Sequence, residues 1–177
     1  MSGFRYRKNL DGTAGAPANL NVVGANSVVF QVGDLIRVNT SGFGALVTTG
    51  DVILGVVTGV TDKNGIAVDP DSATLDVYTM ASDNQTVAQK KVHFIPALPN
   101  YLFFNDSDDT LARTNLFQFF DVNDENDVDV ATAHDSTSSQ VRLVEIDPDG
   151  DGDASKGLFQ IVESFFSQLQ GSGGIEA

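Results

Sequence analysis

The sequence predicts an all-β fold, namely a small antiparallel β-barrel or sandwich with an extended N-terminal arm and long acidic loops. Short apolar runs, several of them alternating with period two, are separated by turn residues roughly every 8 to 12 positions. Glycine and β-branched residues fill these runs, and both lower helix propensity. Twenty of the 24 acidic residues are Asp, which favours turns, and only four are the helix former Glu.

Length and composition limit the classes of function. A chain of 177 residues with 41% hydrophobic content suits one packed domain rather than wholesale disorder. A net charge of −14 opposes direct binding to nucleic acid or to an anionic membrane, and favours a basic partner or divalent cations. The absence of cysteine excludes disulfides and cysteine-based zinc sites. We expect neither a secretory signal nor a membrane span, because no apolar run has the required length.

Residues 1–26 are expected to form an extended arm, because Gly, Ala and Asn dominate after Leu10 and no periodicity holds. The arm begins with aromatic and basic residues, Phe4, Arg5, Tyr6, Arg7 and Lys8. Aromatic and arginine side chains are enriched in binding hot spots, and a basic segment on an acidic chain attracts an acidic neighbour, such as a second copy. We predict that these residues contact a partner subunit. A terminus without fixed structure is the interpretation that also remains open.

Residues 27–170 are predicted to form the β domain, which opens with a Gly-rich β module over residues 27–62. Its strands are expected at 28–32, 35–38, 46–47 and 52–60. Turns are predicted at Gly33-Asp34, Asn39 to Gly42 and Gly50-Asp51, because glycine adopts positive φ at little steric cost.

The remaining strands and a terminal hairpin are predicted over residues 73–166. They are expected at 74–80, 87–95, 101–104, 116–120, 140–146 and 158–166. The last two strands are joined by an acidic loop and form the hairpin. Residues 171–177 are expected to be a flexible tail.

Negative charge is concentrated in residues 106–153, which contain fourteen acidic and two basic side chains. Within this window, residues 121–139 are polar and show no helical period, so we expect a solvated or partner-facing loop there. This asymmetry between the halves of the chain is more informative than the total charge.

The strongest candidate for a metal site is the series Asp147, Asp149, Asp151 and Asp153. Carboxylates at every second position, with glycines between them, can surround a hard cation such as Ca²⁺. The series begins like an EF-hand loop, but its twelfth position is Leu158 rather than Glu, and its flanks are predicted strands. Two interpretations stay open: a solvated hairpin tip without any cofactor, and a loop that binds Ca²⁺ weakly.

No catalytic motif is present, and we expect no enzymatic activity. The chain has no nucleophile elbow, phosphate-binding loop or dinucleotide fingerprint. A second acidic cluster has the residue types of a glycosidase pair, but it lies in a predicted loop and the chain has no Trp for stacking on sugars. The cluster comprises Asp121, Asp124, Glu125, Asp127 and Asp129. The two histidines, His93 and His134, lack the spacing of metal ligands.

The order of strands and turns in the opening module resembles the β module of tailed-bacteriophage head decoration, or capsid cement, proteins. The matching segments are 32–36 (VGDLI), 40–42 (TSG), 50–51 (GD) and 53–57 (ILGVV). The start of the chain, 3–12 (GFRYRKNLDG), is similar to the arms that open several phage virion proteins. The strongly acidic second half is more extreme than this module requires.

The resemblance implies a non-enzymatic virion structural protein on the outer capsid surface. Such proteins often form homotrimers and clamp neighbouring subunits of the major capsid protein, so Arg5, Arg7 and Lys8 would contact the capsid or another subunit. The alternative is a Ca²⁺-dependent or sugar-recognising β-sandwich module, such as a fibre or adhesin domain.

Overall fold

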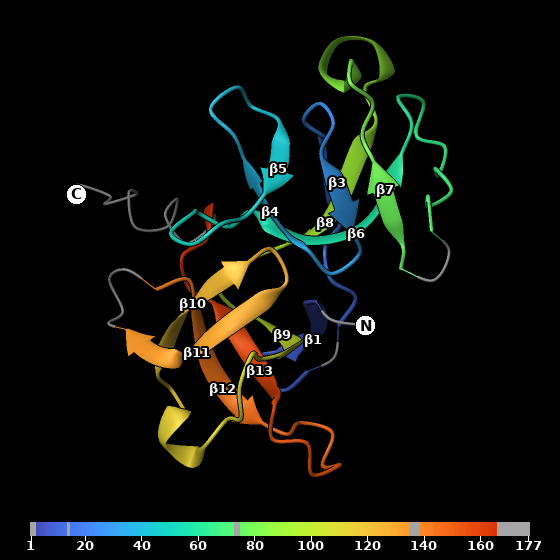
Figure 1. Cartoon of the computed structure of the whole chain (residues 1–177). Coiled ribbons are helices and arrows are strands. Elements are labelled where there is room, and N and C mark those ends of the chain that lie inside the picture. Colours follow the sequence, from blue (N-terminus) through green and yellow to red (C-terminus); the bar gives the residue numbers. More distant parts are fainter. Residues whose placement is uncertain (1–2, 14, 73–74, 135–138, 166–177) are drawn as a thin grey trace, which may run out of the picture.

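The computed structural model describes residues 3–13, 15–72, 75–134 and 139–165, and it describes no side chain for residues 132–134. It confirms the all-β prediction, with three antiparallel sheets that pack together as a sandwich (Figure 1). The described strands form three open sheets and no closed barrel. The predicted tail at 171–177 lies outside the described residues.

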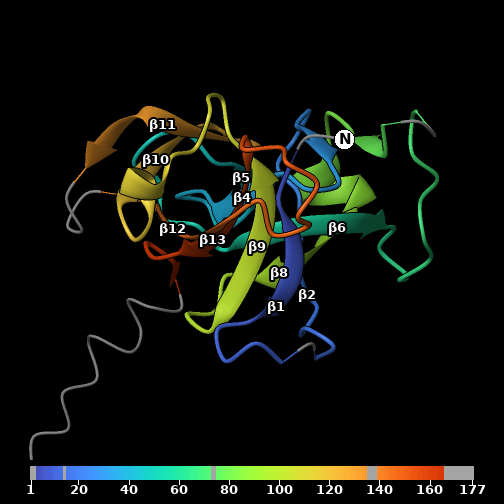
Figure 2. The ribbon, with the colours of Figure 1, turned by 90° about the horizontal axis from the view of Figure 1, so that it is seen from below.

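The larger sheet has six strands in the order β1-β9-β13-β12-β10-β11. Its members are β1 (Arg5–Asn9), β9 (Tyr101–Asp106), β10 (Phe119–Asp124), β11 (Asp127–His134), β12 (Val141–Ile146) and β13 (Lys156–Ile161). The predicted terminal hairpin is confirmed, because β12 and β13 pair antiparallel from Val141↔Ile161 to Ile146↔Gly157. Figure 2 shows β1 beside β9, which places a segment from the start of the chain at one edge of this sheet.

The second sheet has five strands in the order β2-β8-β6-β4-β5. They are β2 (Leu20–Val23), β4 (Leu35–Val38), β5 (Gly44–Leu46), β6 (Gly55–Thr61) and β8 (Lys91–Pro96). Packing explains why residue 55, on the central strand of this sheet, is glycine: a Cβ there would lie 2.3 Å from the carbonyl oxygen of Ile95. A close approach between neighbouring backbones therefore requires glycine at this position.

A two-stranded sheet, β3 (Val29–Gln31) with β7 (Val77–Thr79), completes the strands. Two short helical turns connect strands, a π turn at Asn84–Ala88 and a 3₁₀ turn at Arg113–Asn115. No helix in the described part of the chain is long and apolar enough to cross a membrane.

The five-stranded sheet is buried on both faces at its centre, which explains its continuous apolar runs. Leu35 and Val56 face the larger core that it shares with the six-stranded sheet, whereas their neighbours Ile36 and Val57 face a second core. That second core includes Phe30 from the two-stranded sheet. Successive strand residues point to opposite faces, so β4 and β6 each supply both cores.

Two predictions about local structure are wrong. Residues 1–26 are not an arm separate from the β domain, because they supply β1 and β2 to the two large sheets. Residues 121–134 are not a loop, because β10 and β11 pair there and turn at Asp124↔Asp127. In both cases the strand forms by hydrogen bonding to a partner strand, and the local sequence pattern does not predict that pairing.

Candidate interaction surface

Phe4, a predicted partner contact, is instead a core residue of its own chain. Its side chain is 1% exposed and its ring packs edge-on against Phe159, with centroids 6.5 Å apart. Its backbone N–H donates to the carbonyl oxygen of Gly33 at 2.8 Å. Burial of an aromatic ring anchors the start of the chain to the larger core, so Phe4 is not available to a partner.

Tyr6 is held by neighbouring aromatic rings. Its centroid lies 5.0 Å from that of Tyr101 and 6.2 Å from that of Phe103, both in edge-on geometry. Its hydroxyl donates to Oδ1 of Asn9 at 3.0 Å. A register shift between Tyr6 and Lys8 leaves Arg7 as the bulged residue of β1. Bulges and basic residues are both common on edge strands, where they discourage uncontrolled pairing.

The basic side chains of β1 reach acidic residues that lie far away in the sequence. Arg7 Nη2 is 2.7 Å from Oδ1 of Asp149, and Lys8 Nζ is 2.8 Å from Oε2 of Glu145. These pairs are partly exposed, so each stabilises the fold only slightly and a competing carboxylate can replace the internal one.

A surface hollow of about 450 Å³ opens beside β1. Three basic, two acidic and two aromatic residues line it: Arg5, Tyr6, Arg7, Phe104, Asp106, Asp149 and Lys156. Asp106 contributes a buried Oδ1 atom that has no hydrogen-bond partner. Three of the residues predicted from sequence therefore line one hollow together, namely Arg5, Tyr6 and Arg7. Phe4 lies beneath the surface instead, and Lys8 pairs with Glu145.

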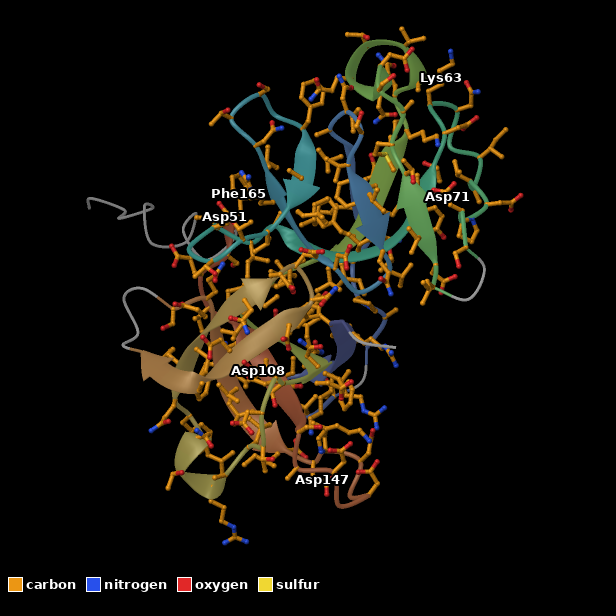
Figure 3. All side chains as sticks on the ribbon, in the orientation of Figure 1. Asp51, Lys63, Asp71, Asp108, Asp147 and Phe165 are labelled. Atoms are coloured by element: carbon orange, nitrogen blue, oxygen red, sulfur yellow. The ribbon has the colours of Figure 1, made fainter. Side chains whose placement is uncertain are left out.

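The loop that contains the predicted metal ligands is closed by its own hydrogen bonds. Asp147 accepts N–H groups from Asp151 and Gly152 at 3.1 and 2.9 Å. Lys156 Nζ lies 2.5 Å from Oδ2 of Asp151 and 3.3 Å from Oδ2 of Asp153. The loop projects from the end of the molecule opposite Lys63 and Asp71, as the position of Asp147 in Figure 3 shows.

The charges in this loop stabilise one another. The hydrogen bond from Lys156 lowers the pKa of Asp151, and hydrogen bonds from Ser155, together with Lys156, lower the pKa of Asp153. The hydrogen bonds of Lys156 to Asp151, first, and to Asp153 raise the pKa of Lys156. No group of three or more His, Cys, Asp or Glu residues is arranged to hold a metal ion in the part of the chain that the structure describes. Weak Ca²⁺ binding by Asp147, Asp149, Asp151 and Asp153 remains a prediction.

Asp34 is a second acidic centre, with a different environment. It is 3% exposed, and its Oδ2 accepts the N–H of Gln31 at 2.6 Å. Burial first, and then the charges of Glu125 and Asp124, raise its pKa from an ordinary 3.8 to about 7, against the hydrogen bond from Gln31. The side chain of Asn126 also hydrogen-bonds to this carboxyl group. Desolvation and like charges both disfavour the ionised form.

Asp34 lies where three parts of the fold meet. Gly33, at φ +102°, accepts the N–H of Phe4 and donates its own N–H to the carbonyl oxygen of Val57. The N–H of Leu35 donates to the carbonyl oxygen of Glu125 at 2.5 Å, which places the β10–β11 hairpin tip against the turn (Figure 1). A Cβ at Gly33 would meet the backbone of Gly3 at 3.3 Å, so glycine allows this close approach.

The remaining candidates have structural roles or lie outside the described side chains. His93 Nε2 is 2.9 Å from Oγ1 of Thr61, on a neighbouring strand. The side chain of His134 is outside the described part of the structure. Asp121, Asp124, Glu125, Asp127 and Asp129 belong to the β10–β11 hairpin. Burial and then the charge of Asp108 raise the pKa of Asp127.

Sequence reasoning used Gly33-Asp34 only as a turn marker and missed the burial of Asp34. The available signal was an Asp between apolar runs on both sides, since an acid in that setting either caps a turn or becomes buried. Its acidic neighbours come from a hairpin about ninety positions later, and no local pattern reveals that contact.

Family models, curated proteins and solved structures were each searched, and none matches the chain.

Proposed function

We propose that this chain is a structural binding protein that attaches to the outer surface of a phage capsid and bridges neighbouring major capsid subunits. The observation that carries the proposal is the basic edge of the six-stranded sheet, where Arg5 and Arg7 of β1 line one hollow with Lys156 of β13 and two acids. The molecule as a whole is strongly acidic. The strand and turn pattern of residues 32–57 supports the capsid assignment by resemblance.

A symmetric capsid shell can be bound tightly through many weak contacts of the kind that this basic edge offers. An acidic side chain of a capsid subunit can exchange with Asp149 at Arg7, and each exchange contributes little free energy. A shell repeats the contact by symmetry, so a protein that spans two or more subunits gains affinity without any single strong site. The basic edge also steers an acidic partner toward one face of the molecule.

The proposed unit on the shell is a homotrimer. Among the strands that the structure describes, none pairs with the edge of β1 that faces away from β9, and such an edge is available for pairing. Sedimentation equilibrium of the purified chain tests this directly, with a single species of three times the chain mass as the expected result. A monomer at every concentration contradicts the trimer.

The capsid proposal is tested by co-sedimentation of the purified protein with intact and with emptied phage heads. We expect saturable pelleting, and a loss of about tenfold or more in apparent affinity for Arg5→Glu/Arg7→Glu, because two hot-spot cations are reversed. Lys63→Glu is the matched control, since it reverses an exposed charge far from the acidic loop (Figure 3). The proposal fails if the parent never pellets with heads, or if both charge-reversed proteins bind equally.

A further inference from the structure

A second surface hollow, of about 400 Å³, lies beside Asp34 and is distinct from the one at β1. Its lining combines aliphatic side chains, one amide and two acids: Val28, Val29, Gln31, Asp34, Leu46, Val77 and Glu125. The aliphatic residues come from the β3–β7 pair and from β5, and the acids come from the β3–β4 turn and the β10–β11 hairpin. The hollow therefore has apolar walls and a negative end.

None of the described residues that line this hollow is basic. The charged groups that act on Asp34 are Glu125 and Asp124 of the hairpin, and both are acidic. β3, β5 and β7 present only Val, Leu and Gln to the hollow. A buried carboxylate is ordinarily paired, because desolvation of an unpaired charge is costly. Asp34 has hydrogen-bond donors from Gln31 and Asn126, yet no residue in the described part of the chain supplies a countercharge.

We propose that this hollow binds a lysine or arginine side chain of a protein partner. The methylene stem would lie against Val28, Val29, Leu46 and Val77, and the cationic head group would meet the carboxylates of Asp34 and Glu125. Long basic side chains bury their stems on apolar surface in this way while the head finds a carboxylate. Charge complementarity with a molecule of net charge −14 favours the same class of partner.

The hollow adds a feature that a simple acidic patch lacks. Binding of a cation favours the ionised form of Asp34, whose pKa in the free protein is about 7, so binding releases a proton. The competent, ionised fraction grows as the pH rises through 7. Affinity for a cation should therefore be about tenfold or more higher at pH 8 than at pH 5.5.

The test is an NMR titration of the isotope-labelled full chain with n-butylammonium chloride, in which backbone amide shifts are followed. 1-Butanol is the neutral probe of equal shape, and sodium chloride controls for ionic strength. We expect saturable shifts at Gln31, Leu35 and Glu125 with n-butylammonium alone, and weaker binding at pH 5.5 than at pH 8. Asp34→Asn should abolish saturation, and Glu125→Gln should weaken it severalfold.

Asp109→Asn is the matched control, since it removes an exposed carboxylate elsewhere and should bind the amine like the parent. Urea unfolding of each variant verifies that it is folded. The inference is overturned if 1-butanol and n-butylammonium give the same shifts, or if Asp34→Asn binds the amine as the parent does. It does not rest on capsid binding, because the test uses only this chain and an amine.

Discussion

The loop around Asp147 and the junction around Asp34 are both acidic, yet their charges behave in opposite ways. In the loop, exposed carboxylates accept local N–H groups and the ammonium of Lys156, which lowers the pKa of Asp151 and Asp153. At the junction, burial and two acidic neighbours raise the pKa of Asp34. The dense run of acidic residues in the sequence therefore holds carboxyl groups of lowered pKa, whereas the single buried Asp34 has a raised pKa.

The comparison also explains why the chain uses Asp rather than Glu. At least thirteen of the twenty aspartates accept a hydrogen bond from a backbone N–H, most of them within five positions. They are Asp11, Asp34, Asp51, Asp62, Asp71, Asp108, Asp109, Asp124, Asp127, Asp129, Asp147, Asp151 and Asp153. The short Asp side chain reaches a nearby N–H in a turn, which the longer Glu does less well. Much of the net charge thus follows from turn construction.

The largest expected effect concerns Phe4, whose burial fixes the backbone beside Gly33 and Asp34. Phe4→Ala removes a ring that is 1% exposed and should lower the free energy of unfolding by about 3–5 kcal/mol. Phe117→Ala is the matched control, because Phe117 is 63% exposed and should change stability by less than about 0.5 kcal/mol. Urea denaturation measures both. Equal losses would mean that the start of the chain is not anchored in the core.

The second prediction concerns how the free energy of unfolding depends on pH, which Asp34 and the acidic loop should affect differently. The folded pKa of about 7 lies above the ordinary 3.8, so the folded state holds a proton that the unfolded chain releases. Stability is then full below about pH 4 and falls as the pH rises through 7, by on the order of 2.5 kcal/mol between pH 5 and pH 7.5.

Asp34→Asn should remove most of this slope in urea denaturation at a series of pH values. A smaller slope of the same sign should persist, because burial also raises the pKa of Asp127 and Glu163. The acidic loop adds nothing in this range, since its carboxyl groups with lowered pKa titrate below the ordinary value. Identical slopes in parent and variant would contradict the assignment.

Lys156→Gln tests the loop itself and should have a smaller effect. The variant loses the ammonium that contacts Asp151 and Asp153, so the pKa of both carboxyl groups should rise. The unfolding midpoint should fall slightly at low salt and match that of the parent at high salt, because exposed ion pairs are screened. A large loss that is independent of salt would show that the loop contributes to stability in another way.

Removal of divalent cations should have the smallest effect. Asp147 and Asp151 already accept internal N–H groups, and Lys156 supplies a positive charge to the loop. We therefore expect the same thermal midpoint in EDTA and in millimolar CaCl₂. A saturable rise of the midpoint with Ca²⁺, lost in Asp151→Asn, would instead support the alternative of a Ca²⁺-dependent module.

The sequence predicted the strands that have apolar residues on at least one face, such as β4, β9 and β12, because burial leaves a clear pattern. It missed β1 and β2, and of the β10–β11 hairpin it predicted only the first two residues as strand. The residues of β1 and much of the hairpin are charged or polar. Asp is depleted in strands, so the run from Asp121 to Asp129 looked like a loop. β1 forms because Phe4 is buried and β9 offers a free edge, and both causes lie in tertiary structure.

The candidate sites likewise combine residues that the sequence could predict with contacts that only the tertiary structure creates. Arg5 and Arg7 could be chosen from charge and position alone, and they do line one hollow. The pairing of Arg7 with Asp149 and the approach of Glu125 to Asp34 each join residues about ninety or more positions apart. Such contacts depend on strand order and register, which short-range patterns do not determine.

The central claim is that Asp34 is a buried carboxyl group to which no described residue supplies a countercharge. Its most direct test is the titration of Asp34 itself. Carboxyl ¹³C chemical shifts of the labelled protein, followed from pH 4 to pH 9, report the pKa of each Asp separately. We predict an inflection near 7 for Asp34 that moves down in Glu125→Gln, while Asp151 and Asp153 titrate below the ordinary 3.8. An inflection for Asp34 near 4, unchanged in Glu125→Gln, would contradict the account.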